Sequence, residues 1–247
     1  MKIQIFTKED QAYGAFNGGE IVENKPVGFP REGGKLKPYS NMFYWANAIA
    51  KVDSTIGLHP HKGFEIMSFV LAGTIKHFDT KLNAWKELSA GDVQIIRAGN
   101  GISHSEFMEK DARMFQIWLD PDLQKTLKQD ASYDDFQSDQ FPKLTQGSNE
   151  ITTLIGEGSP LKLDTEGVIT QRIKVIKASY QLQTNTDLLV GIYILSGKFK
   201  VDGDEANTDD FILIEDANEV IFDGVGDLFI LSTPKKLSYK TYAESMH

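Results

Sequence analysis

The stretch from residue 59 to residue 73 reads HPHKGFEIMSFVLAG and joins a histidine pair to an apolar run that ends at a glycine. On a β-strand, residues i and i+2 project from the same face, so His59 and His61 can direct two ring nitrogens to one point. A second pair with the same spacing, His104 and Glu106, follows further along the chain. Two such pairs on neighbouring strands predict a metal site with four ligands.

The remainder of the chain predicts an all-β fold. Short runs of β-branched and aromatic residues alternate with Gly, Asn and Asp, which is typical of sandwiches and barrels. One short helix is expected near residue 120, where Asp120 is the candidate cap and Pro121 suits the first helical position. The clearest predicted strands are 41–48, 65–71, 74–78, 92–96 and 114–119.

The second half of the chain weakly repeats the first. Residues 188–197, LLVGIYILSG, are similar to residues 64–73, FEIMSFVLAG. In this alignment the four candidate ligands fall on Gln183, Asn185, Phe222 and Gly224. We therefore expect an N-terminal metal-binding barrel at 1–129, a polar linker at 130–150 and a C-terminal barrel at 151–247 that lacks metal ligands.

Composition narrows the classes of function. The net charge is −9, and residues 130–247 carry 20 acidic but only 10 basic side chains. Such a surface repels phosphate backbones, so direct binding of nucleic acid is not expected. The absence of cysteine excludes disulfides and thiolate chemistry. No apolar run approaches the roughly 20 residues that span a bilayer, and the N-terminus is not a signal peptide. These features predict a cytoplasmic protein without a membrane segment.

The carboxylate ligand has two candidates. Glu65 lies four residues past His61 and either holds a histidine ring nitrogen or replaces Glu106 as the ligand. We favour Glu106, because it shares a face with His104. Ile75, His77 and Asp79 alternate along one stretch, so His77 could line the cavity, but we favour a solvated or hydrogen-bonded strand histidine. The terminal His247 is expected to be disordered.

Aromatic residues are concentrated in the first half of the chain. Each of them is best explained as core, but together they would form a cavity for a flat aromatic substrate. The candidates are Phe43, Tyr44, Trp45, Phe64, Phe69, Phe115 and Trp118. A divalent ion with one carboxylate ligand carries a charge of about +1, which favours an anionic substrate.

Two motifs resemble those of the pirin family in the cupin superfamily. The first is residues 59–65, HPHKGFE, the second is residues 91–106, and the strand 115–119 that follows also matches. The resemblance is strongest over residues 40–120. It implies a bicupin, that is, two double-stranded β-helix (jelly-roll) barrels with metal in the N-terminal one.

The resemblance also implies a ligand set and an activity. The family's ligands fall on His59, His61, His104 and Glu106, whereas cupins in general use the first-motif glutamate, here Glu65. The family metal is typically non-haem Fe(II), with Mn, Ni, Co, Cu or Zn as alternatives, and we expect one ion per chain. Some pirin-like proteins are quercetin 2,3-dioxygenases, which open the flavonol heterocycle with O2.

We therefore expect a dioxygenase for a small, anionic, flavonol-like substrate. Its catalytic base would be Glu65 if Glu65 is not a ligand, or Glu106 if Glu106 detaches from the metal. The alternative, also implied by the family, is a metal-dependent redox-sensing or coregulator protein that acts through a protein partner without turnover.

Overall fold

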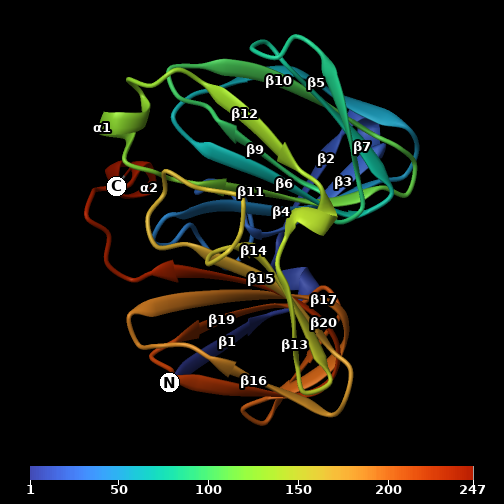
Figure 1. Cartoon of the computed structure of the whole chain (residues 1–247), viewed down its shortest axis with the longest axis vertical. Helices are drawn as coiled ribbons and strands as arrows, with labels where there is room; N and C mark the ends of the chain where they lie inside the picture. The colour runs from blue at the N-terminus through green and yellow to red at the C-terminus, as the bar shows by residue number, and fades with distance from the viewer. Residues whose placement is uncertain (247) are drawn as a thin grey trace. The chain divides into compact units, whose positions relative to one another are not determined.

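The structure is a computed structural model that describes residues 1–246, so the prediction for His247 lies outside the described part. The chain forms two compact units of antiparallel strands (Figure 1). Residues 11–138 and 238–246 form the first unit, here called the N-barrel. Residues 1–10 and 139–237 form the second, the C-barrel. Within residues 1–246, no helix has the length and apolar character needed to cross a membrane.

The N-barrel contains two antiparallel sheets. In its seven-stranded sheet the order is β12 (Ser132–Phe136), β9 (Val93–Arg97), β6 (Glu65–Ala72), β11 (Arg113–Leu119), β4 (Met42–Ala50), β3 (Ile21–Val27) and β2 (Ala12–Phe16). In its four-stranded sheet the order is β5 (Ser54–His61), β10 (Ile102–Met108), β7 (Thr74–Asp79) and β8 (Trp85–Ser89). Two four-residue helices, α1 (Leu123–Thr126) and α2 (Tyr242–Ser245), also belong to this unit.

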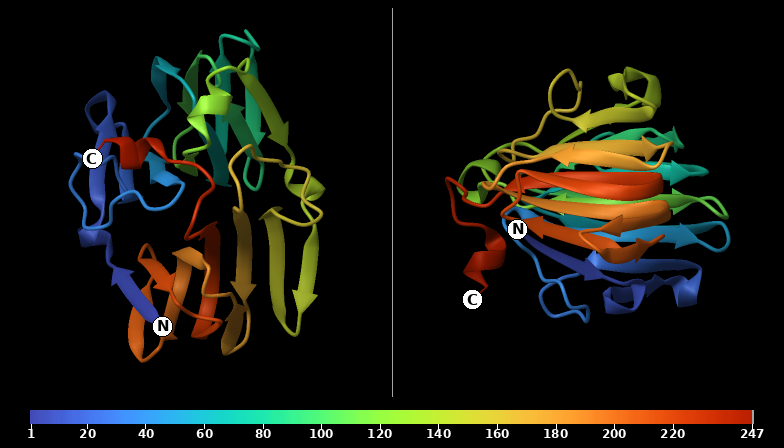
Figure 2. Two further views of the ribbon diagram at one scale, coloured as in Figure 1. Left: turned by 90° about the vertical axis from the view of Figure 1, so that its left-hand side faces the viewer. Right: turned by 90° about the horizontal axis from the view of Figure 1, so that it is seen from below.

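The C-barrel is a single nine-stranded sheet, and in Figure 2 its orange and red strands lie side by side. The order is β1 (Lys2–Phe6), β19 (Phe211–Glu215), β17 (Leu188–Val201), β20 (Glu219–Pro234), β15 (Ile169–Val175), β14 (Asn149–Ile155) and β13 (Lys143–Gln146). In addition, β16 (Ser179–Gln183) pairs with β20, and β18 (Asp204–Asn207) pairs with β17. The remaining elements are three 3₁₀ turns, η1 (Lys8–Asp10), η2 (Asn17–Gly19) and η3 (Ser138–Gln140).

The all-β bicupin prediction is confirmed. All five predicted strands are present as β4, β6, β7, β9 and β11, with ends within two residues of the prediction. The expected helix is also present, but its cap is Asp122, whose side chain accepts the backbone N–H of Gln124. Asp120 instead accepts the backbone N–H of Ala243, at the start of α2.

The observed units differ from the expected boundaries at both termini and in the linker. Strand β1 pairs with β19 of the C-barrel, and residues 238–246 belong to the N-barrel. The expected linker, 130–150, holds β12 and β13, and β12 completes an edge of the N-barrel by pairing with β9. An edge strand with one face in solvent carries polar residues, which explains its linker-like composition.

The interiors of the two barrels differ in polarity. The C-barrel is filled by one continuous cluster of buried apolar side chains. In the N-barrel, the apolar side chains form separate clusters, and the two ends of β10 belong to different ones, Ile102 to one and Met108 to another. The inward positions between these two, His104 and Glu106, are polar and buried. A buried polar layer therefore crosses the middle of the N-barrel.

Candidate metal centre

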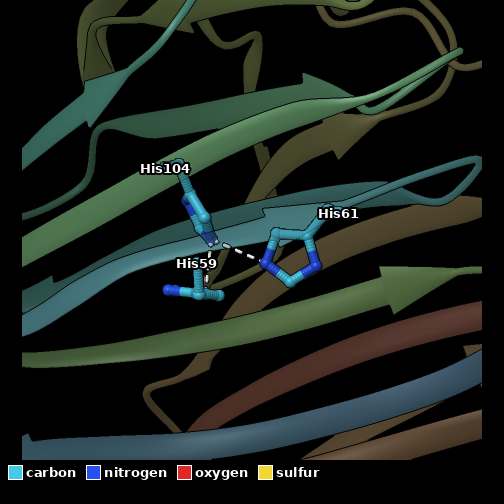
Figure 3. Close-up of side chains that lie close together, drawn as sticks. All are labelled: His59, His61 and His104. Atoms are coloured by element: carbon cyan, nitrogen blue, oxygen red, sulfur yellow. Dashed lines mark hydrogen bonds between the residues drawn. The ribbon is translucent and has the colours of Figure 1, made fainter.

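Two adjacent strands bring three histidines together. His59 and His61 lie on β5, and His104 lies on β10, where the antiparallel register places it directly opposite His59. The Nε2 atom of His104 lies 2.9 Å from Nε2 of His59 and 2.9 Å from Nε2 of His61 (Figure 3). The three rings thus converge through the same type of nitrogen.

This arrangement fits a divalent ion. Two nitrogens bound at about 2.1 Å and at right angles to one ion lie about 3 Å apart, close to the distances observed here. Burial, reinforced by the neighbouring imidazoles, lowers the pKa of His104 to about 2 and that of His61 to about 3. Neutral imidazole is the form that binds metals, so these two rings are ready to act as ligands at neutral pH.

The Nδ1 atom of His59 lies 2.7 Å from the carbonyl oxygen of Gly57, two residues back on the same strand. When Nδ1 carries the proton, this contact is a hydrogen bond that leaves the Nε2 lone pair directed at the other two rings. The ring of His59 is therefore oriented by the backbone of its own strand.

Glu106 lies deeper in the barrel. It forms a second group with His77 and His104, in which one potential ligand atom from each residue lies within 4.8 Å of the others. Its carboxylate accepts hydrogen bonds from Ser68 and Gln94 on one oxygen and from Gln116 on the other. A β-bulge between His104 and Glu106 shifts the pairing with β5, and such bulges reorient side chains.

Glu65 has a different environment. It is buried on β6, but its carboxylate lies 3.6 Å from the guanidinium of Arg97, which also bonds Asp134 on β12. In the part of the chain that the structure describes, Glu65 belongs to neither group of potential metal ligands. Glu65 is thus placed as an ion-pair partner in the wall of the barrel.

His77 lies beside the histidine cluster, with its ring centroid 5.6 Å from that of His104. It is fully buried on β7, its Nε2 lies 2.8 Å from an oxygen of Asp79, and its ring stacks on Tyr133 with centroids 4.5 Å apart. The prediction of a hydrogen-bonded strand histidine is confirmed, whereas the solvated alternative is wrong. The alternation of Ile75, His77 and Asp79 indicates that they share a face of the strand. The burial of that face depends on Tyr133, which lies within the stretch that the sequence predicts to be a linker.

The aromatic residues that were predicted to line a cavity fall into two sets. Trp118 packs edge-on against His61 with centroids 4.7 Å apart, and Phe43 and Phe64 pack around Trp118. Tyr44 also contacts Trp118. The other set, Trp45, Phe69 and Phe115, is almost completely buried and belongs to the core. An aromatic wall therefore stands beside the histidine cluster.

The C-barrel lacks the corresponding donors. If Phe222 corresponds to His104, strand pairing puts Tyr180 at the position of His59 and Leu182 at that of His61. On that correspondence, the counterparts of His59 and His61 are Tyr180 and Leu182, three residues before Gln183 and Asn185. Phe222, Tyr180 and Leu182 all belong to the apolar core, so packed side chains occupy the place of the ligands.

Comparisons with known proteins identify relatives of this chain. The family model named Pirin matches residues 34–119. A putative quercetin 2,3-dioxygenase from Pseudomonas aeruginosa is 30% identical over 165 residues, which cover 64% of this chain and 67% of that protein. A putative quercetin 2,3-dioxygenase from Zymomonas mobilis is 40% identical over 79 residues, 31% of this chain, so the chain spans only 33% of that relative.

The fold has a similar counterpart among solved structures. The crystal structure of the bacterial pirin YhhW from Escherichia coli in complex with nickel(II) superposes with a TM-score of 0.77. The match covers 95% of this chain and 100% of that chain at 21% sequence identity. At this identity the likeness shows the bicupin fold alone.

Proposed function

The chain belongs to the pirin family, and we propose that it is a metal-dependent dioxygenase that opens the heterocycle of flavonols such as quercetin. One divalent ion would be held by His59, His61, His104 and Glu106. The observation that carries the proposal is the convergence of three Nε2 atoms at 2.9 Å spacings beside a buried carboxylate. The names of the relatives and the nickel(II) complex of YhhW support the same activity and a divalent metal.

A bound ion would supply Lewis-acid and redox chemistry at this point. We favour Fe(II), because three imidazoles and one carboxylate suit borderline divalent metals, and Ni, Mn, Co, Cu or Zn also suit this set. The single carboxylate leaves the occupied site positively charged, so the site would favour the deprotonated form of a bound flavonol. Trp118 and Phe64 offer flat apolar surfaces for the substrate rings.

Glu106 is our candidate for the catalytic base, because its carboxylate lies in the same layer as the histidines. If it detaches from the ion, one of its carboxylate oxygens would take the proton of the flavonol hydroxyl, while Ser68 and Gln116 hold the group in place. The pairing of Glu65 with Arg97 makes Glu65 the weaker candidate for this role. The cysteine-free chain suits the reducing cytoplasm, which is the location we propose.

The test compares quercetin consumption with and without O2 by protein loaded with Fe(II), Ni(II), Co(II) or Mn(II). We expect consumption that needs both metal and O2 and that releases carbon monoxide. His59→Ala and His61→Ala should abolish it, since each removes a ligand. Metal-loaded protein that consumes no quercetin with any of these ions would refute the proposal. That outcome would favour the alternative of a metal-dependent protein that acts through a protein partner.

A further inference from the structure

Two buried ring nitrogens of the N-barrel have no hydrogen-bond partner among the described residues: Nδ1 of His77 and Nδ1 of His104. Both side chains are completely buried, and the ring centroids lie 5.6 Å apart. A buried polar atom without a partner costs roughly 1–3 kcal/mol. Two such atoms on neighbouring rings therefore call for a shared explanation.

Asp79 determines which nitrogen of His77 carries the proton. Its Oδ1 atom accepts the backbone N–H groups of Lys81 and Leu82, both at 2.7 Å, and its Oδ2 lies 2.8 Å from Nε2 of His77. An ionised carboxylate only accepts hydrogen bonds, so the proton of His77 lies on Nε2. The Nδ1 atom of His77 consequently carries a lone pair and is an acceptor.

In His104 the proton and the lone pair are on the opposite nitrogens. Its Nε2 faces the Nε2 atoms of His59 and His61, so its lone pair is needed at Nε2 when the three rings share an ion. Its proton then lies on Nδ1, which becomes a donor. The unpaired donor of His104 and the unpaired acceptor of His77 thus belong to neighbouring rings, and one ring nitrogen of each lies within 4.8 Å of one of the other.

We propose that Asp79 and His77 are positioning residues for the metal ligand His104. In the metal-bound protein, the Nδ1–H group of His104 donates to Nδ1 of His77, and the Nε2–H group of His77 donates to Asp79. Tyr133 stacks on the ring of His77 with an interplanar angle of 10° and keeps it in place. Such a chain orients the ligand and increases its basicity.

This proposal rests on the metal site but not on dioxygenase activity. Its main test is Asp79→Asn, which keeps the size of the side chain and can keep an oxygen toward Lys81 and Leu82. The new amide N–H then points at Nε2 of His77 and moves the proton of that ring to Nδ1. There it meets the Nδ1–H group of His104, so two donors face each other.

We expect Asp79→Asn to weaken Zn(II) binding by about 10- to 100-fold in competition with a chelator. In nitrogen-15 spectra of the Zn(II)-loaded proteins, His77 should carry its proton on Nε2 in the wild type and on Nδ1 in the variant. Asp92→Asn is the matched control, since Asp92 accepts the backbone N–H groups of Ser89 and Ser138 in the same barrel. It should bind Zn(II) as the wild type does.

A second pair of variants separates this role from mere packing. His77→Gln retains an acceptor for His104 and should bind Zn(II) more tightly than His77→Leu, which does not. Wild-type affinity in folded Asp79→Asn would overturn the proposal. So would a second Zn(II) per chain that is lost in His77→Leu, because His77 would then be a ligand itself. A wild-type protein that binds no divalent ion would instead refute the metal site on which the proposed function depends.

Discussion

At the scale of single residues, the two buried glutamates of the N-barrel differ in their partners. Glu106 faces the histidine layer, whereas Glu65 pairs with Arg97. We expect Glu106→Gln to weaken Ni(II) binding by more than about 100-fold, because it removes the carboxylate from the ligand set. Glu65→Gln should leave the affinity within about twofold of the wild type, since its carboxylate pairs with Arg97 and belongs to neither group of potential metal ligands.

Isothermal titration of both metal-free variants with Ni(II) measures this difference. Urea unfolding of the same samples shows whether each variant is folded, since Glu106 also accepts hydrogen bonds from Ser68 and Gln94. Loss of Ni(II) binding in Glu65→Gln alone would assign the carboxylate ligand to Glu65 instead.

At the scale of elements, local patterns were sufficient where a strand lies in the middle of a sheet. Strands β6 and β9 have long apolar runs and were predicted almost to the residue. The cap of α1 was misplaced, because Asp120 and Asp122 both suit a cap by sequence. The choice depends on Ala243, which is distant in sequence and gives Asp120 another role.

For the candidate site too, local sequence patterns predict the residues that share one strand but not the contacts between distant segments. The pairs at 59/61 and 104/106 need only the alternation of a strand to share a face. The burial of His77 depends on Tyr133, which lies on an edge strand with a polar sequence. The ion pair that draws Glu65 away from the ligands likewise joins β6 to β9 and β12.

A buried ion pair on β3 gives a second prediction. Lys25 lies 3.4 Å from Glu23 and 2.7 Å from Glu32, and the hydroxyl of Tyr44 donates to Glu23. We expect Lys25→Met to lower the free energy of unfolding by about 3–5 kcal/mol at pH 8, because Glu23 remains buried without its cation. Urea unfolding at pH 5 and pH 8 measures the effect.

The cost of Lys25→Met should be smaller at pH 5. Burial raises the pKa of Glu23 and Lys25 opposes this, so the substitution raises that pKa further. A carboxyl with a raised folded pKa contributes stability that is present below its unfolded pKa and lost as the pH rises through the folded pKa. Lys174→Met removes an exposed pair with Glu150 and should cost about 0.5 kcal/mol or less at either pH. A cost independent of pH would contradict this explanation.

The turn after β9 gives a third prediction. Gly99 has a φ of +49°, and a Cβ there would lie 2.6 Å from the carbonyl oxygen of Gln129. Gly18 has a similar φ of +69°, but no atom lies within 4 Å of the corresponding position. We expect Gly99→Ala to destabilise the protein by about 2 kcal/mol more than Gly18→Ala, because only the former adds a steric clash. Equal midpoints of urea unfolding for the two variants would show that the loss of stability comes from backbone strain alone and not from the clash with Gln129.

At the scale of the whole molecule, each end of the chain joins the barrel that is formed mainly by the other half of the sequence. Strand β1 pairs with β19, and Ile3 and Ile5 pack against the C-barrel core. Residues 238–246 return to the N-barrel, where Tyr242 contacts Phe43. Short terminal segments carry no local signal for such distant partners, so the boundaries of the units could not be predicted from sequence.

The last prediction concerns metal binding, because the candidate ligands are confined to one of the two barrels. All the candidate ligands lie in the N-barrel, whereas Tyr180, Leu182 and Phe222 fill the corresponding place in the C-barrel. Ni(II) at 100 times its dissociation constant should stabilise the N-barrel by about 2.7 kcal/mol, because only the folded site binds the ion. Hydrogen–deuterium exchange should slow in β5 and β10 and remain unchanged in β17 and β20, with one Ni(II) bound per chain.

His59→Ala provides the control, since Ni(II) should then protect neither barrel. Equal protection of β17 and β20 in the wild type would show that the ion stabilises both barrels together.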